Sequence, residues 1–323
     1  PDPAARANQV DLNDKTVARE AQSIRIEDRR DTVSLVITNK DERSLSETLD
    51  ALKSSVGQLL DELLVVDASR GALDDIRLSH DWARWIDYIQ PAGLRITIAH
   101  QRNLGVREAT GDIIVFTDSG CLPEEGWLER LLAPILDEGE MVSCGPARAM
   151  GKSVYPGIHT SDSKVNIDYV PRAATINLAF RREAFEAIGG FDETFGSAED
   201  FDFTWRLNDS GYRLRWVQDA VVTHDYGTPA RQLRRAFFYG KGECRLLRKH
   251  PHRIAEAAKQ NAAPMVYALF LLGLPLSVRW KWYPLALLWP MWRLRNEDLR
   301  WLVLLDHLIM GAGVLHELVR PGT

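Results

Sequence analysis

One stretch of the sequence decides the fold class: Gly111-Asp112-Ile113-Ile114-Val115-Phe116-Thr117-Asp118-Ser119-Gly120-Cys121. Its apolar run, residues 113–116, has glycine on both sides, which is typical of a strand covered on both faces in a parallel sheet. Asp118 stands where this strand would end. Ligands of open α/β sheets bind beyond the carboxyl ends of the strands, so Asp118 is a candidate site residue. The alternative is that its carboxylate only caps the next turn.

Similar apolar runs recur along the chain and predict further strands. They lie at 33–38, 62–67, 95–99, 178–180, 214–217 and 220–222, with an edge strand at 141–146. Capped or amphipathic segments predict helices at 45–60, 103–109, 123–136, 182–188 and 201–207. Residues 147–173 show no period and predict a long loop. Alternating strands and helices indicate right-handed βαβ units and a mostly parallel sheet.

Composition excludes several classes of protein. The 323 residues suffice for one large α/β domain with an appendage. A net charge of -5 argues against nucleic acid as a partner, because no basic excess exists to neutralise phosphates. Three distant cysteines without a C-x-x-C pair predict neither disulfides nor a zinc site, and favour the cytoplasm. Residues 1–30 are polar, lack the apolar core of a signal peptide, and predict an extension.

The character of the chain changes after about residue 230. A basic helix is expected at 232–249, followed by apolar segments at 265–276 and 301–318 with a tryptophan-rich stretch between them. Charged residues interrupt this region, so none of it is a clean membrane span. Tryptophan beside lysine and arginine suits a membrane interface, although a packed helical subdomain is the alternative. We therefore expect a catalytic domain at 31–230 and a helical, membrane-associated region at 231–323.

Separated segments of this chain, taken in order, resemble family 2 glycosyltransferases over about residues 33–250. The segments are Val33 to Glu42, Leu64 to Ser69, Gln101 to Val106, Thr117 to Gly120, Asn177 to Arg182, Ile188 to Glu193, Glu199-Asp200 with Trp205-Arg206-Leu207, and Val222 to His224. The resemblance implies the GT-A fold, which is a Rossmann-like, mostly parallel sheet flanked by helices. It also implies an inverting transfer of a sugar from a nucleotide-sugar donor to a hydroxyl group.

The resemblance assigns roles to individual residues. Asp200 would be the general base, and Glu199 would orient the acceptor or a donor hydroxyl. The alternative for this pair is a solvated helix start, where acidic residues are common. Asp67 would accept the imide proton of the base, or else only cap a turn. The expected nucleotide-sugar-binding residues are Asn39, Glu42, Asp67, Arg102 and Asp118.

The resemblance also implies a divalent cation, Mn²⁺ or Mg²⁺, which would neutralise the diphosphate of the donor. Asp118 and His224 are the candidate ligands, a mixed oxygen and nitrogen set that suits these ions. His224 could instead be a histidine satisfied in the core or a turn. Gly120 replaces the second aspartate of the family's metal motif. The ion would therefore be held weakly, through water, or replaced by Arg or Lys side chains.

The implied partners are a UDP- or GDP-sugar, a lipid-linked or cell-envelope polysaccharide acceptor, and a membrane surface at its cytoplasmic, inner face. A sugar-nucleotide nucleotidyltransferase is a competing hypothesis, but residues 38–42 contain no glycine and lack its glycine-rich, Arg-Lys signature. A catalytically degenerate GT-A binding protein is another, and Gly120 is the feature that favours it.

Overall fold

The computed structural model describes residues 31–55, 59–92, 98–150, 167–293 and 299–320, so the expected extension at 1–30 lies outside the described residues. In the described part, eight strands form a sheet of order β3-β2-β1-β4-β9-β6-β10-β8, and a smaller sheet has the order β5-β11-β7. The strands are β1 (Val33–Asn39), β2 (Glu62–Asp67), β3 (Arg84–Asp87), β4 (Ile113–Asp118), β5 (Cys121–Pro123), β6 (Val142–Cys144), β7 (Ala147–Ala149), β8 (Tyr169–Val170), β9 (Asn177–Arg181), β10 (Leu214–Trp216) and β11 (Val222–His224).

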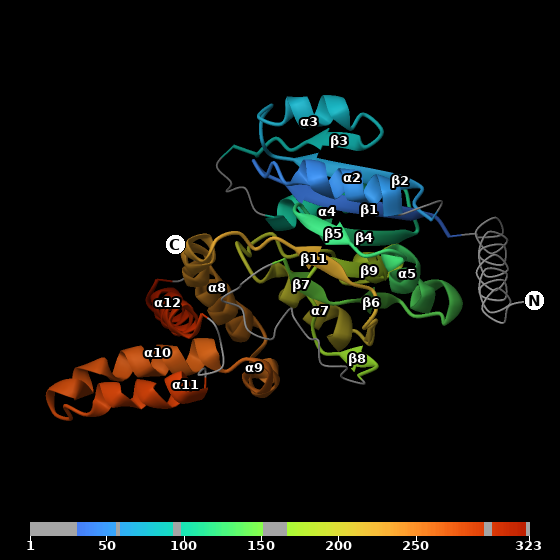
Figure 1. Cartoon of the computed structure of the whole chain (residues 1–323). Helices are drawn as coiled ribbons and strands as arrows, with labels where there is room; N and C mark the ends of the chain where they lie inside the picture. The colour runs from blue at the N-terminus through green and yellow to red at the C-terminus, as the bar shows by residue number, and fades with distance from the viewer. Residues whose placement is uncertain (1–30, 56–58, 93–97, 151–166, 294–298, 321–323) are drawn as a thin grey trace, which may run out of the picture.

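Helices cover both faces of the large sheet and give three layers (Figure 1). One face packs against α2 (Leu45–Ser55), α3 (Asp74–Ser79) and α5 (Trp127–Asp137). The other packs against α4 (Ile98–Glu108), α6 (Arg182–Ala187) and α7 (Glu199–Asp209). In β1, Leu35 and Ile37 face the first layer, whereas Val36 faces the second. Burial on both faces explains why the central strands are continuous apolar runs.

The register of the central strands brings polar side chains to one edge of the sheet. β1 pairs in parallel with β2 and β4, which places Asn39 beside Asp67 and Thr38 beside Asp118. β2 also pairs in parallel with β3. β9 runs antiparallel to both β4 and β6, so the sheet is mixed beyond β4. The carboxyl ends of β1, β2 and β4 therefore lie side by side, as in other open α/β sheets that bind ligands.

The strand predicted at 95–99 is wrong at its end, because Ile98 and Ala99 begin helix α4; residues 93–97 lie outside the described residues. The helix predicted at 103–109 is the later part of α4. The strand that pairs with β2 at the edge of the sheet is β3 (Arg84–Asp87), which the sequence analysis missed. Both end residues of β3 are exposed at the sheet edge, so its sequence lacks the apolar run that marked its neighbours.

Three other predictions need correction. The helix predicted from residue 123 begins at Trp127, because Pro123 pairs with Val222 in the small sheet. The segment 141–146 holds β6, which lies between β9 and β10 and not at an edge. The expected loop at 147–173 contains β7 and β8. These strands are two or three residues long, too short for a period to be recognised.

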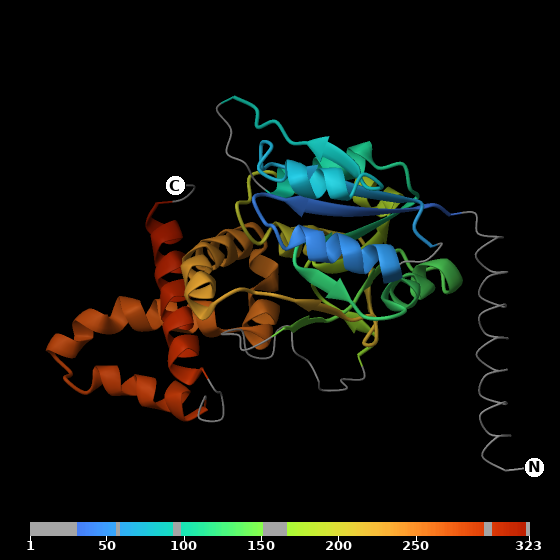
Figure 2. The same ribbon diagram turned by 45° about the horizontal axis from the view of Figure 1, so that its top comes forward.

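The C-terminal third is helical. Its elements are α8 (Pro229–Lys249), η1 (Pro251–Arg253), α9 (Ile254–Gln260), α10 (Ala263–Gly273), η2 (Leu274–Val278), η3 (Tyr283–Leu287), α11 (Leu288–Arg293) and α12 (Arg300–Val319). In both views α12 lies against α8, whereas α10 and α11 project away from the sheet (Figures 1 and 2). Among the described residues, α12 is long and apolar enough to cross a membrane, with a mean hydropathy of 1.6. The helices at 251–260 and 263–278 meet that criterion only as a pair, bent by 97°.

Glycines allow α8 and α12 to approach closely. A Cβ atom at Gly240 would lie 2.0 Å from the backbone oxygen of Met310, and one at Gly313 would lie 2.1 Å from that of Phe237. Because both obstacles are backbone atoms, they cannot rotate away. We conclude that α12 is fixed to α8 by direct backbone contact.

Gly240→Val should separate α12 from α8 and lower the free energy of unfolding by about 1–3 kcal/mol, the usual cost of overpacking. The measurement is urea unfolding together with limited proteolysis of the 299–320 region. Gly196→Ala is the control, since a Cβ there meets no atom within 4 Å. Equal unfolding midpoints for the two variants would contradict the close packing.

Candidate active site

Asn39 joins the ends of the three central strands. Its side-chain nitrogen donates to Asp67 Oδ1 at 3.4 Å, and its oxygen accepts from Ser119 Oγ at 2.7 Å. Asp67 also accepts from the backbone nitrogen and hydroxyl of Ser69, at 3.2 and 2.6 Å. Asp67 thus caps a turn, as the simpler interpretation predicted, while it stays at the carboxyl edge beside Asn39. The segment that follows Asp118 is held to the same edge through Ser119.

Arg102, on α4, connects two carboxylates that are distant in sequence. Its guanidinium is 3% exposed, forms a short ion pair with Glu199, and lies 3.6 Å from Asp118 Oδ1. Its other contacts are aromatic, with Phe116 and Phe191 ring centroids at 5.9 and 5.7 Å. A buried guanidinium needs such partners, because an unpaired buried charge is costly. The structure therefore places Arg102 between the acidic residues, and its ion pairs are with the carboxylates of Asp118 and Glu199.

Glu199 and Asp200 begin helix α7. Glu199 is buried against Arg102, so it is not part of a solvated helix start. Burial raises the pKa of Asp200 to about 7, and the neighbouring charges of Glu199 and Asp118 add to this while Arg102 opposes it. Asp200 Oδ1 accepts a local hydrogen bond from the backbone nitrogen of Phe201, at 2.8 Å. A carboxylate with this pKa can accept a proton efficiently near neutral pH.

His224 reaches the same edge from the small sheet. Strand pairing sets it opposite Cys121, and its Nδ1 lies 3.5 Å from Cys121 Sγ. Burial lowers the pKa of His224, and the charge of Asp118 only partly offsets this, so the imidazole is neutral at pH 7. Gly120 lies between these residues with φ +86°, and a Cβ there would be 3.5 Å from the imidazole ring. Asp118 is therefore close enough in space for its charge to act on the pKa of His224.

Two arginines that the sequence analysis did not assign to the site come from the first turns of α8. Glu42 forms a short ion pair with Arg231 and lies 3.9 Å from Arg235 Nη2. Tyr239 follows one turn later; burial raises its pKa, and the charges of Asp118, Glu199 and Asp200 add to the shift, although Arg235 opposes it. The spacing 231, 235 and 239 places these residues on one helix face, a signal that was available in the sequence. Helix α8 thus adds two cations beside the acidic group.

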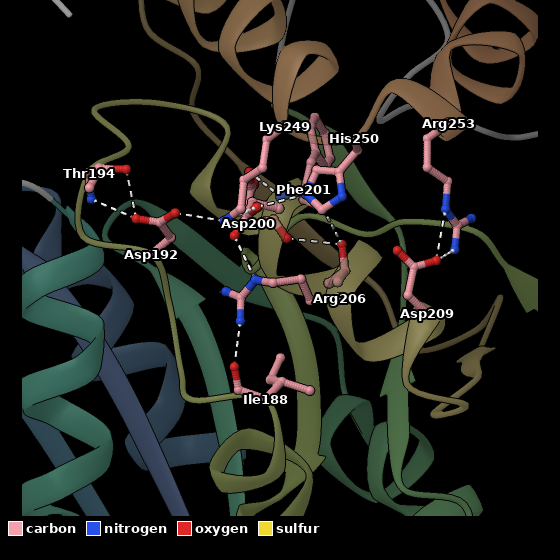
Figure 3. A network of polar contacts seen from close by, with 12 residues as sticks. Ile188, Asp192, Thr194, Asp200, Phe201, Arg206, Asp209, Lys249, His250 and Arg253 are labelled. Carbon is pink, nitrogen blue, oxygen red and sulfur yellow. Dashed lines mark hydrogen bonds and ion pairs between the residues drawn. The ribbon is translucent and has the colours of Figure 1, made fainter.

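Behind the site, Asp202 joins helix α7 to the C-terminal end of α8. It is fully buried and accepts from Arg206 Nε at 2.8 Å, Lys249 Nζ at 2.7 Å and His250 Nε2 at 2.8 Å. Arg206 donates in turn to the backbone oxygen of Ile188 at 2.9 Å. Figure 3 shows Lys249 and His250 reaching down from α8 towards α7. Asp202 therefore fixes α7 to the end of α8.

In the described residues, Asp209, His250 and His252 also bring ligand atoms within 4.8 Å of one another. Each already has a charged or polar partner. His250 Nε2 donates to Asp202 Oδ1, and His252 Nε2 is 3.1 Å from Asp209 Oδ2. Arg253 also forms an ion pair with Asp209, drawn in Figure 3. A cation here would have to displace a guanidinium, so we assign no metal to this group.

A sequence model described as "Glycosyl transferase family 2" matches residues 32–196, a little more than half of the chain. The chain belongs to glycosyl transferase family 2. A model described as "Glycosyl transferase family group 2" matches residues 158–315. The first match includes Arg102 and Asp118, and the second includes Glu199, Asp200 and the arginines of α8. The family resemblance predicted from the motifs is confirmed.

Similar proteins agree with this assignment to the family. A pre-mycofactocin glycosyltransferase of Mycobacterium tuberculosis is 33% identical over 191 residues, which cover 54% of this chain and 40% of that protein. The O-antigen chain rhamnosyltransferase WbaN of Salmonella anatum is 24% identical over 195 residues, covering 55% of this chain and 61% of that protein. This chain therefore matches about half of the length of these relatives.

A solved structure supports the fold. The mannosyltransferase PcManGT from Pyrobaculum calidifontis, determined with GDP-Man and Mn²⁺, has a TM-score of 0.53. It is 21% identical, and the match covers 90% of this chain and 88% of that one. This likeness shows that the fold is GT-A, as the sequence predicted.

Asp202→Asn should lower the free energy of unfolding by about 3 kcal/mol, because a fully buried carboxylate that three donors share, two of them cationic, would be lost. Asp209→Asn on the same helix is the matched control. It has similar partners but is partly exposed, so its loss should stay below about 1 kcal/mol. The measurement is chemical denaturation of both variants. Equal losses would show that the buried network does not hold α7.

Proposed function

We propose that this chain is an inverting glycosyltransferase that moves a sugar from a UDP- or GDP-sugar to a hydroxyl group. The observation that carries the proposal is Arg102, whose buried guanidinium lies between Asp118 and Glu199. Three acidic residues, including Asp200, thereby meet one cation at the carboxyl edge of the sheet. This excess of negative charge, flanked by Arg231 and Arg235, suits a donor that brings a diphosphate together with a divalent cation.

In this proposal the donor lies across the ends of the central strands. Asn39 and Asp67 bind its base or ribose by hydrogen bonds, because both present polar groups beside one another at the ends of β1 and β2. Arg235 and Arg231 face the diphosphate, with Glu42 holding them in place through its ion pairs. These fixed cations stabilise the charge that develops on the leaving nucleoside diphosphate.

The side chains present fit a divalent cation, Mn²⁺ or Mg²⁺. Asp118 is 34% exposed and offers a carboxylate, and the neutral imidazole of His224 offers a nitrogen. A bound cation would supply Lewis-acid stabilisation of the diphosphate. The presence of Mn²⁺ and GDP-Man with the similar mannosyltransferase supports this choice. Gly120 contributes no side chain, so the protein supplies fewer ligands than a motif with two aspartates would.

Asp200 acts as the general base of the transfer step. An acceptor hydroxyl attacks the anomeric carbon from the face opposite the diphosphate and gives its proton to Asp200. The bond between that carbon and the diphosphate oxygen breaks, and the nucleoside diphosphate leaves with the electron pair. Glu199, fixed by Arg102, orients the acceptor or a donor hydroxyl.

For the acceptor, we propose a lipid-linked or polysaccharide substrate at the cytoplasmic, inner face of a membrane. The similarity to an O-antigen chain rhamnosyltransferase supports a cell-envelope glycan. We also propose that residues 31–230 form the catalytic domain and that 231–323 form the membrane-associated region. The boundary would lie within the first turn of α8, which contacts the site through Arg231.

Asp200→Asn should lower turnover of the donor by about 10² or more, a typical contribution of a general base. In the unmodified chain, kcat/KM should fall as the pH is lowered through about 7, because protonation removes the base. The measurement is release of nucleoside diphosphate from a panel of UDP- and GDP-hexoses with Mn²⁺.

Two controls complete this experiment. Asp209→Asn, on the same helix, should keep turnover, and UDP or GDP should raise the melting temperature of both variants. Unchanged turnover in Asp200→Asn would remove Asp200 from its role. Donor binding without turnover in the unmodified chain would favour a binding protein. Stabilisation by nucleoside triphosphates alone would favour a nucleotidyltransferase.

His224→Ala should raise the Mn²⁺ concentration for half-maximal turnover by about tenfold or more, since one of the protein's ligands is lost. The measurement is turnover at saturating donor across a Mn²⁺ titration. His252→Ala is the control, because this exposed histidine pairs with Asp209 away from the site. An unchanged Mn²⁺ dependence in His224→Ala would show that the ion does not bind His224.

A further inference from the structure

A helical hairpin at residues 262–292 projects from the body of the protein. One limb runs through α10 and η2, and the other through η3 and α11, with a tip at 279–282 (Figures 1 and 2). The limbs pack on each other, since the rings of Phe270 and Tyr283 stack at 5.3 Å and the Tyr283 hydroxyl donates to the Phe270 oxygen at 3.0 Å. The hairpin is therefore a defined element and not two independent helices.

The surface of this hairpin is apolar to an unusual degree. The sequence has no charged residue at 262–278 or at 282–292. Both limbs carry large apolar side chains that are more than 60% exposed, among them Leu269, Leu272, Val278, Trp282, Leu288 and Trp289. Soluble monomers rarely expose an apolar patch of this extent. Some other phase or molecule must cover it.

The distribution of charge points to lipid. At the tip, Arg279 and Lys281 alternate with Trp280 and Trp282, the combination that lies at the boundary between lipid and water. The limbs between this boundary and the body are uncharged and offer a partner protein no ionic contact. The start of α10 packs on α12, where the Tyr267 and His307 rings lie 5.2 Å apart. Beyond that contact the first limb runs over residues 269–278 and is roughly 15 Å long at about 1.5 Å per residue, about half the thickness of the hydrocarbon core.

Helix α12 meets the usual criterion for a membrane span better than the hairpin does, but its polar residues serve another purpose. Glu317 is buried and pairs with Arg245 at 2.9 Å and Lys241 at 3.9 Å, both on α8. The close approach at Gly240 and Gly313 fixes the same two helices. Moving α12 into lipid would break these ion pairs. Packing on α8 thus accounts for Glu317 and the glycines of α12, and α12 also supports the start of α10, where a Cβ at Gly311 would lie 2.7 Å from the backbone nitrogen of Ala268.

We infer that the hairpin at 262–292 inserts into the lipid bilayer and that α12 stays outside it, as a support packed on α8. The inference rests on the proposed membrane location but not on the transfer reaction. Because α8 also carries Arg231 and Arg235 beside the acidic residues, one helix connects the inserted element to the donor site. The site is thereby held at a fixed distance from the membrane surface.

The test is flotation of the full chain with vesicles of phosphatidylethanolamine and phosphatidylglycerol. Leu269→Asp with Leu272→Asp should lower the vesicle-bound partition coefficient at least about tenfold, because apolar burial is lost and two charges enter lipid. Leu78→Asp with Ile89→Asp is the matched control on the catalytic domain, where these side chains are 81% and 84% exposed. It should float like the unmodified chain. So should Leu305→Asp with Leu318→Asp, at two exposed positions of α12.

Binding to phosphatidylcholine vesicles in about 0.5 M salt should persist, since insertion of apolar surface is not screened. Loss of flotation in salt would overturn insertion and indicate attraction to anionic head groups. An equal loss in the α12 variant would overturn the assignment of α12. A chain that does not float, but forms a dimer that the hairpin variant abolishes, would assign the hairpin to a protein contact. Donor turnover, measured without vesicles, should be the same in all variants, so failure of flotation leaves the proposed reaction untouched.

Discussion

The arrangement of the site depends on the burial of one guanidinium. Arg102 is held between Asp118, at the end of a strand, and Glu199, at the start of a helix 97 positions away from Arg102 along the chain. A cation in this position is tolerated only because both carboxylates stay with it, so the acidic residues are brought together before any ligand binds. The single positive charge of Arg102 does not balance the negative charges of these carboxylates and Asp200. Asp200 is left in a negative environment, which is the second cause, after burial, of its raised pKa. The same excess of charge makes the edge of the sheet receptive to a cation.

A second buried group ties this site to the C-terminal helices. Helix α7 presents Glu199 and Asp200 to the site from its first turn, and Asp202, on the same turn, points the other way to Lys249 and His250. Near its start, helix α8 contacts Glu42 through Arg231. At its last residue, it contacts Asp202 through Lys249. It therefore contacts both sides of the site. A displacement of α8 along its axis would strain an ion pair at each end, so the position of the C-terminal region and the geometry of the acidic residues are linked.

The sequence predicted the elements that are buried on both faces and missed those that are not. β1, β2 and β4 are continuous apolar runs because helices cover both of their faces, and their bounds agree with the prediction to within two residues. β3, at an exposed edge, carries no such pattern. The acidic residues and His224 were found through motifs in the catalytic segments. Arg231 and Arg235 were not, because their contact with Glu42 joins residues almost 190 positions apart and is set by tertiary packing. Their spacing of four residues marks a shared helix face, but it does not record what that face contacts.

The charges of the basic helix have a role within the protein. From the sequence, the cations of α8 beside apolar segments suggested attraction to a membrane. In the structure many of these cations have partners within the protein: Arg231 pairs with Glu42, Arg245 with Glu317, and Lys249 with Asp192 and Asp202. A guanidinium or ammonium that is held in this way gains little from lipid head groups, because the ion pair would first have to break. The charge of α8 therefore serves the protein's own packing, and the case for a membrane rests on the hairpin, whose limbs are uncharged and expose large apolar side chains.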